Sequence, residues 1–300
     1  MTVVAKLENV SKIIKGTILI DNVDLEVHEG EILALIGENG AGKTSLMKLL
    51  FMFLTPTTGK IELFGQNIVN NSKSYKLYNK MESIIETPLF DEEMTAKQVL
   101  EFHCKYMSYQ DDKAIEKTLN LLGIYQDSDR KIKEFSLGMK QKLALCKSFV
   151  TNPSLLILDE PLNGIDSKST NKILNVLKEL SINQKTTIVI SSHVLKDLDK
   201  IADRAYILSR GRIVKEIDLK ILERRKYLEI VTNEVKRVQR ILESEMKKKD
   251  IQILDDRLKI YYYESDELII DELMRKLMDE KISINSISKN EMSLEEYVDV

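Results

Sequence analysis

Short runs of consecutive apolar residues, closed by glycine or by polar residues, recur through the first two thirds of the chain. The clearest are "EILALIG" (31–37), "LLILD" (155–159) and "TTIVIS" (186–191). Such runs are typical of strands that are buried on both faces of a parallel sheet. An amphipathic helix pattern follows the first run, and turn residues separate the others. The pattern therefore predicts an α/β domain.

The pattern changes after Gly211, because all 11 glycines and all 4 prolines lie at or before that residue. In the remainder, residue spacing predicts four strands and two helices. The strands are expected at 227–232, 250–256, 257–263 and 282–288, and the helices at 233–248 and 266–280. We therefore predict two domains, residues 1–215 and a small α+β domain at 216–300.

Composition and charge argue against several classes of function. The 300 residues are 43% hydrophobic and carry a net charge of −3, so no strong field favours nucleic acid or anionic lipid. No apolar run approaches the roughly 18 residues of a membrane span, and Lys6 and Glu8 interrupt any secretory signal. Cys104 and Cys146 lack metal-binding spacing and are expected to be reduced. We expect a cytoplasmic protein without a nucleic-acid partner.

The apolar run at 31–37 leads into a loop with the spacing G-x-x-x-x-G-K-T. Glycines let successive backbone N–H groups turn inward and surround phosphate oxygens, and the next helix adds its positive N-terminal end. Lys43 supplies a charge for the terminal phosphates, and the Thr44 hydroxyl can ligate Mg²⁺. The complete match outweighs a chance glycine turn. The predicted nucleotide-binding residues are Gly37, Glu38, Asn39, Gly40, Ala41, Gly42, Lys43, Thr44 and Ser45.

Polar residues follow the two other buried runs. Asp159 is the last residue of the run at 155–159, and Glu160 follows it. His193 lies just after the run at 186–191. A phosphoryl-transfer site needs a carboxylate for Mg²⁺ and a group that activates water. Asp159 fits the first role, and Glu160 fits the second as general base. An acid pair at a helix start is the alternative. At this edge of a parallel sheet, the histidine is placed to contact the γ-phosphate and the attacking water.

The stretch "EFSLGMKQ" (134–141) resembles the signature sequence of ABC ATPases, usually written LSGGQ. It departs from that pattern because Phe135 takes the leucine position and Leu137 takes the first glycine. The order of phosphate loop, signature, acid pair, "NGID" (163–166) and histidine also resembles an ABC nucleotide-binding domain, over residues 3–215. The similarity implies an ATP hydrolase of the P-loop NTPase fold that uses ATP and Mg²⁺.

In that family two subunits close head to tail, so that the phosphate loop of one and the signature of the other enclose each ATP. The resemblance implies that Ser136, Gly138 and Gln141 complete the partner subunit's site, although a serine before a helix also serves as its N-cap. It further implies a homodimer on ATP binding, bound through separate permease subunits to the inner face of the cell membrane. Soluble ABC proteins that act on ribosomes or nucleic acid, and a nucleotide-switched module without turnover, are the alternatives.

Glu86 stands where relatives carry a glutamine that ligates Mg²⁺ and contacts the membrane subunit. A carboxylate also ligates Mg²⁺, so the resemblance makes Glu86 a further metal contact. "IIETP" together with "SLGMKQ" resembles the ATPase subunits of lantibiotic-immunity and bacitracin-resistance exporters. A damaged or neutral position, in an exporter of unrelated cargo, is the alternative.

Two further features follow from the resemblance. Relatives stack an aromatic side chain on adenine near Ile14, whereas no Phe, Tyr or Trp lies between Lys6 and Phe51 in this chain. We therefore predict weak discrimination between ATP and GTP. The tail resembles the C-terminal extension of many exporter ATPases, and its role as a dimer contact, a regulator or a solubilising appendage stays open.

Overall fold

The computed structural model describes residues 2–69, 71, 74–86, 88–111, 113–222, 225–245, 250–263 and 266–298. The chain forms two compact units, residues 1–217 and 218–300. Among the described residues, every helix is too short or too polar to cross a membrane.

A six-stranded sheet in the order β10-β9-β3-β8-β7-β6 lies at the centre of the first unit. Its strands are β3 (Ile32–Ile36), β6 (Met81–Ile84), β7 (Leu155–Leu158), β8 (Thr187–Ser191), β9 (Arg204–Ser209) and β10 (Arg212–Asp218). Strands β6, β7, β8, β3 and β9 run parallel. Every residue of β3, β7 and β8 is buried, which explains why these strands are nearly continuous apolar runs. The predicted α/β fold is confirmed.

A second, antiparallel sheet in the order β2-β1-β4-β5 packs beside the first. Its strands are β1 (Val3–Ile14), β2 (Thr17–His28), β4 (Thr58–Leu63) and β5 (Gln66–Asn67). Helix α1 (Lys43–Leu50) buries Leu46, Met47, Leu49 and Leu50 in a core shared with both sheets. This packing fixes the helix that follows the phosphate loop.

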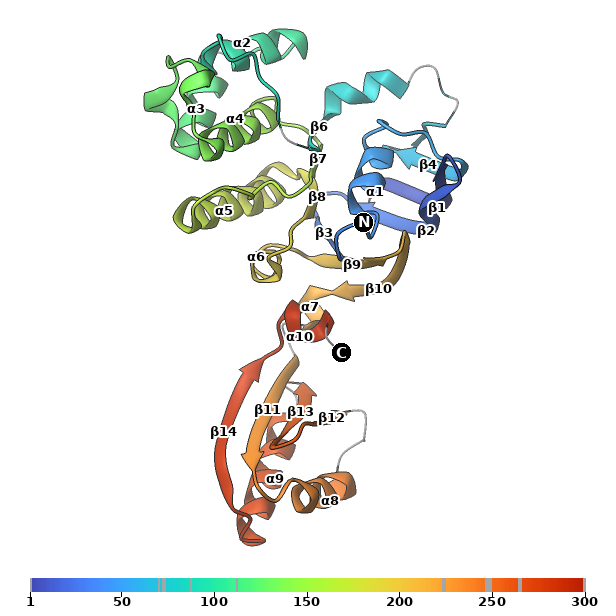
Figure 1. Cartoon of the computed structure of the whole chain (residues 1–300), viewed down its shortest axis with the longest axis vertical. Coiled ribbons are helices and arrows are strands. Elements are labelled where there is room, and N and C mark those ends of the chain that lie inside the picture. The colour runs from blue at the N-terminus through green and yellow to red at the C-terminus, as the bar shows by residue number, and fades with distance from the viewer. Residues whose placement is uncertain are drawn as a thin grey trace. The chain divides into compact units, whose positions relative to one another are not determined.

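Helices α2 (Ala96–Tyr106), α3 (Ala114–Leu122) and α4 (Leu137–Val150) gather at one side of the parallel sheet (Figure 1). A capping box of Thr95 and Gln98 begins α2. His103 of this helix lies 2.6 Å, Nε2 to Oε1, from Glu82 of β6, and this buried contact joins the helical group to the sheet. The remaining elements of this unit are α5 (Ser167–Gln184), α6 (Leu195–Asp199) and 3₁₀ turns at Ser74–Lys80, Tyr125–Asp127 and Ile132–Glu134.

The second unit has an antiparallel sheet in the order β12-β13-β11-β14, with a split βαββαβ connection. Its elements are α7 (Leu219–Leu222), β11 (Arg225–Thr232), α8 (Val235–Glu245), β12 (Ile251–Ile253), β13 (Arg257–Tyr263), α9 (Glu267–Asp279), β14 (Ile284–Glu291) and α10 (Leu294–Val298). The strand predicted at 250–256 ends at Ile253, because Leu254 N–H bonds to the Arg257 carbonyl and turns the chain. The predicted end of the preceding helix, at 246–249, lies outside the described residues.

Candidate active site

The phosphate loop joins the end of β3 to the start of α1, and its backbone depends on glycine. Gly37 has φ 156°, and a Cβ at that position would lie 2.4 Å from the Leu208 carbonyl oxygen. Gly42 has φ 110°, and its Cβ would lie 2.9 Å from the Leu19 carbonyl oxygen. A side chain at either position would displace the loop, so only glycine lets the backbone wrap this closely.

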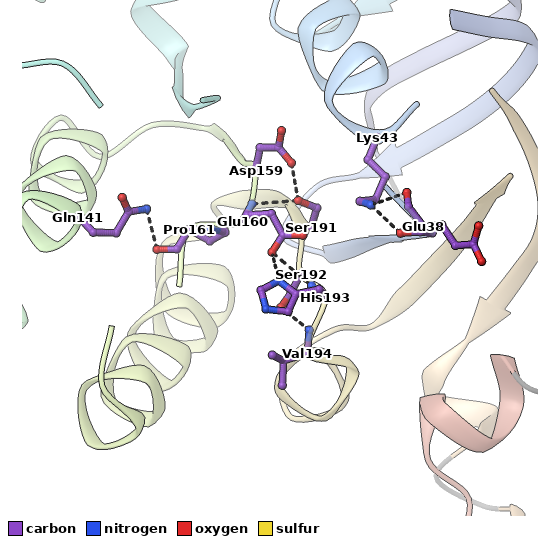
Figure 2. A network of polar contacts seen from close by, with 11 residues as sticks. Glu38, Lys43, Gln141, Asp159, Glu160, Pro161, Ser191, Ser192, His193 and Val194 are labelled. Atoms are coloured by element: carbon purple, nitrogen blue, oxygen red, sulfur yellow. Dashed lines mark hydrogen bonds and ion pairs between the residues drawn. The ribbon is translucent and has the colours of Figure 1, made fainter. Parts of the chain in front are cut away.

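Lys43 is the first residue of α1, and its side chain folds back over the loop (Figure 2). The ammonium donates to the Gly37 carbonyl at 2.6 Å and to the Glu38 carbonyl at 3.1 Å. One positive charge therefore lies within the loop, beside the N-terminal end of a helix. This combination of ammonium, loop backbone and helix end suits a phosphate group.

Asp159 lies directly after β7 and joins three elements around the loop. Its Oδ2 accepts a hydrogen bond from the Thr44 hydroxyl at 2.5 Å, and its Oδ1 accepts one from the Ser191 hydroxyl at 2.6 Å. Carboxylate and hydroxyl oxygens next to a phosphate site suit Mg²⁺, which is usually held by one or two carboxylates together with phosphates. The described residues contain no cluster of three or more His, Cys, Asp or Glu side chains that could hold a metal ion.

Glu160 is held in the left-handed backbone region, at φ 48°. Its Oε2 lies 2.8 Å from His193 Nδ1 and accepts a further bond from the His193 backbone N–H at 3.3 Å (Figure 2). A non-glycine residue in this conformation costs about 1–3 kcal/mol and is retained where the surroundings enforce it. The contacts with His193 thus aim the carboxylate, and they leave 25% of its side chain exposed to solvent.

Ser191 is a site residue to which the sequence assigned no role. Its side chain is fully buried at the end of β8, between the phosphate-loop strand and the acid strand. The hydroxyl donates to Asp159 Oδ1 and accepts from the Glu160 backbone N–H at 2.9 Å. One hydroxyl therefore orients both acids. The only local signal was a small polar residue at the end of a β-branched run.

We expect Ser191→Ala to lower ATP hydrolysis about tenfold and the free energy of unfolding by about 1–3 kcal/mol, because it leaves the half-buried Glu160 N–H without a partner. The measurements are phosphate release and urea unfolding. Ser148→Ala is the matched control, since Ser148 is also buried and, among the described residues, its hydroxyl bonds only to the Leu145 carbonyl of its own helix. Equal hydrolysis rates in the two variants would contradict an orienting role for Ser191.

The signature begins α4, where the exposed Ser136 accepts a hydrogen bond from Met139 N–H at 3.3 Å as the N-cap. A Cβ on Gly138 would lie 2.9 Å from the Gly164 carbonyl oxygen, so the signature packs against the "NGID" loop of the same chain. Gln141, which we expected to contact nucleotide, is buried, and its amide donates to the Pro161 carbonyl at 2.9 Å (Figure 2). This contact ties α4 to the start of that loop.

The loop ends at Asp166, which caps helix α5 by accepting a hydrogen bond from Ser169 N–H at 2.9 Å. The hydrogen bonds from Ser169 hold the pKa of the Asp166 carboxyl below its ordinary value. The carboxylate therefore stays charged near neutral pH, at the end of a loop whose Asn163 and Gly164 face the cleft.

A cleft of about 760 Å³ brings most of the predicted residues together. One wall of the cleft consists of Thr17, Ile18 and Leu19. These residues lie on the same β-hairpin as Ile14, which we expected beside adenine, and they occupy the wall in its place. Ile18 is 55% exposed, and it offers an apolar surface without an aromatic ring. The predicted site residues that line the cleft are Glu38, Asn39, Gly40, Gly42, Lys43, Thr44, Ser45, Glu86, Gln141, Asp159 and Glu160.

Glu86 lies at the rim of this cleft, two residues after the end of β6. Its backbone is also left-handed, at φ 72°, and 66% of its side chain is exposed. The carboxylate forms an ion pair with Lys48 of helix α1. No sequence pattern predicted Lys48 as the partner of Glu86.

A glycine-rich phosphate loop after one parallel strand, with an acid pair after another, defines the P-loop nucleotide hydrolases. The model of the family "ABC transporter" matches residues 20–163. An uncharacterized ABC transporter ATP-binding protein of Bacillus subtilis, YcbN, is 35% identical over 99% of this chain and 96% of its own length. The chain therefore belongs to the ABC transporter family, and it is an ATP-binding and ATP-hydrolysing subunit.

Two further relatives and one solved structure are also ATP-binding proteins of transporters. The bacitracin transport ATP-binding protein BcrA of Enterococcus faecalis is 35% identical over 99% of this chain and 96% of its own. The lantibiotic transport ATP-binding protein SrtF of Streptococcus pyogenes is 32% identical over 70% of this chain and 89% of its own. An ATP-binding subunit of an ABC transporter superposes with a TM-score of 0.66 and 26% identity, covering 74% of this chain and 92% of that one.

Proposed function

We propose that this chain drives an exporter that protects its cell against antimicrobial peptides, either bacitracin or lantibiotics. The observation that carries the proposal is the similarity to BcrA, which extends over 99% of the chain and so includes the C-terminal unit. The similarity to SrtF covers 70% of the chain and supports the same class of cargo. A glutamate at position 86 is the sequence feature that we associate with this group.

In the proposed mechanism, Lys43 and the backbone of Gly40 and Gly42 hold the phosphates. Thr44 and Asp159 would hold Mg²⁺, with Glu86 as a further contact, and the metal would supply charge neutralisation of the phosphates.

We assign activation of the attacking water to Glu160, which follows strand β7, and to His193, which follows strand β8. Glu160 accepts the proton of the attacking water, because its carboxylate faces the cleft. His193 holds that carboxylate through Nδ1 and positions the water, while Ser191 fixes the Glu160 backbone. Closing the site against solvent is assigned to a second subunit.

We propose a homodimer on ATP binding, in which Ser136 and Gly138 contact the nucleotide of the partner subunit. Ser136 is exposed, and its hydroxyl accepts a hydrogen bond from the Met139 N–H in the first turn of its own helix. The signature and the loop that holds Asn163 and Gly164 lie side by side, so both would face the partner together. Gln141 acts in this arrangement by holding that loop in place.

A second hollow, an apolar groove of about 910 Å³, is the surface that we assign to the permease. Three of its large apolar residues are highly exposed to solvent: Leu89 is 93% exposed, Tyr106 78% and Phe102 67%. Contiguous exposed apolar residues mark interaction surfaces. Its other aromatic lining residues are Phe51, Phe53, Tyr75, Tyr78 and Phe90. In this proposal the chain works in the cytoplasm, at the inner face of the cell membrane and without nucleic acid.

We expect Phe102→Asp to abolish co-purification with the permease, because a charge in an apolar contact leaves an unpaired desolvated group. Hydrolysis by the isolated chain should stay within about twofold, since Phe102 is not among the described residues that line the nucleotide cleft. Ile182→Asp is the control, because Ile182 is 66% exposed and does not line the groove. Retention of the permease by Phe102→Asp would rule out this groove.

Nucleotide selectivity is expected to be weak, because Ile18 and its neighbours offer the base an apolar contact without an aromatic face. The ratio of ATP to GTP affinity should lie below about tenfold, or 1.4 kcal/mol. Competition of GTP against a fluorescent ATP analogue measures the ratio directly. A preference for ATP above that value would show that another group reads the base.

Drug susceptibility tests the proposed function as a whole. The chain is expressed with its neighbouring membrane subunits in a sensitive bacterium, and bacitracin and lantibiotics are titrated against wild type and Lys43→Ala. Protection that vanishes in the variant supports ATP-driven peptide export. Absence of protection, with ATP hydrolysis intact, would leave an exporter of unrelated cargo.

A further inference from the structure

Among the described residues, the lining of the nucleotide cleft carries four carboxylates and two cations. The carboxylates are those of Glu38, Glu86, Asp159 and Glu160, and the cations are Lys43 in the phosphate loop and Arg210 after β9. A nucleotide brings several negative charges into this space, so an additional carboxylate at position 86 opposes binding unless a positive charge compensates it.

Lys48 is placed to provide that compensation. It lies one helical turn after Thr44 in α1, so both side chains project from the same face of the helix. Thr44 touches Asp159, whereas Lys48 reaches Glu86, and the Lys48 side chain is only 28% exposed. Because the pair lies at the rim of the cleft with Glu86 largely exposed, it contributes little to folding stability. We expect the ion pair between Lys48 and Glu86 to affect nucleotide affinity instead.

The segment that contains Glu86 also links the two hollows of this unit. Glu86 and Pro88 line the nucleotide cleft, and Leu89 and Phe90 line the apolar groove. The pair with Lys48 is therefore a contact between the phosphate-loop helix and the segment that leads to the groove.

We propose that Lys48 is a positioning residue that neutralises Glu86 and holds its carboxylate at the rim of the cleft. The charge pair allows this chain to carry a glutamate beside the phosphate site. The inference rests on the proposed nucleotide site, and it assigns to Lys48 a role that the phosphate-loop motif does not include.

ATP affinity in EDTA tests the proposal, because without a metal only the charges of the chain act on the nucleotide. A fluorescent ATP analogue is titrated at low salt into wild type, Lys48→Gln, Glu86→Gln and the double variant. Lys48→Gln should weaken binding about three- to tenfold, and Glu86→Gln should tighten it by a similar factor. The double variant should bind within about twofold of wild type, because both charges of the pair are gone.

Two controls and the salt dependence separate charge from structure. Lys48→Arg keeps the charge and should restore wild-type affinity, whereas Lys117→Gln, on the exposed face of α3, should leave it unchanged. Raising the salt from about 0.1 M to about 1 M shortens the screening length from about 10 Å to about 3 Å, so all differences should shrink.

A double variant as weak as Lys48→Gln would overturn the proposal, because Lys48 would then act through the structure of α1. Weaker binding of Glu86→Gln in EDTA would overturn it as well, and so would wild-type affinity in Lys48→Gln. A wild-type chain that binds no ATP when Mg²⁺ is present would refute the nucleotide site on which both proposals rest, which the other outcomes do not touch.

Discussion

Replacing Glu160 by glutamine is expected to slow ATP hydrolysis by about 10²–10⁴-fold while ATP still binds. The amide has the shape of the carboxylate but cannot accept the proton of the attacking water. The contacts of Lys43 with the loop carbonyls and the hydrogen bonds of Asp159 do not involve this side chain, so they should remain. Phosphate release and nucleotide affinity, measured on the same preparation, separate the two effects.

The same variant should accumulate as a closed dimer in saturating ATP, because hydrolysis is the step that reopens the proposed interface. Size-exclusion chromatography with and without ATP measures this. Glu179→Gln, an exposed position on α5, serves as the control for the loss of a glutamate charge. A strictly monomeric Glu160→Gln would contradict the head-to-tail dimer, and unchanged hydrolysis would favour a nucleotide-switched module.

Replacing Lys43 by alanine is expected to weaken ATP binding at least about 100-fold, or 2.7 kcal/mol. The ammonium is the positive charge at the centre of the phosphate loop, and its loss also removes the donor to the Gly37 and Glu38 carbonyls. Charge-assisted contacts to phosphate are among the strongest hydrogen bonds in proteins. Isothermal titration with ATP and Mg²⁺ measures the change.

Lys117→Ala and a thermal melt serve as controls for charge and for folding. Lys117 is exposed on α3 and does not line the cleft. Should Lys43→Ala fold normally and bind ATP within about threefold of wild type, the assignment of the phosphate loop would be refuted.

The C-terminal unit shows which structural features can be predicted from residue patterns and which cannot. Its strands β11 to β14 and its helices α8 and α9 were predicted in the correct order, because alternation and helical spacing are local properties. The short helices α7 and α10 were not predicted. The ends of the predicted elements were less accurate, as at Ile253, where a hairpin hydrogen bond sets the boundary. The order of the strands, with β11 between β13 and β14, depends on pairing between distant segments and was not predicted.

The sequence by itself determined the α/β class, the phosphate loop and the candidate acids. Each of these is encoded within a short segment: Gly37 and Gly42 permit the loop conformation, and full burial on both faces makes β3, β7 and β8 apolar.

The tertiary structure alone decided which side chains act together. The order β3-β8-β7 inserts Ser191 between the loop and the acids, and the packing of α1 brings Lys48 to Glu86. The amide of Gln141 likewise finds its partner in Pro161. These contacts join residues that are 20 to 38 positions apart in the sequence, and no local period or spacing specifies them.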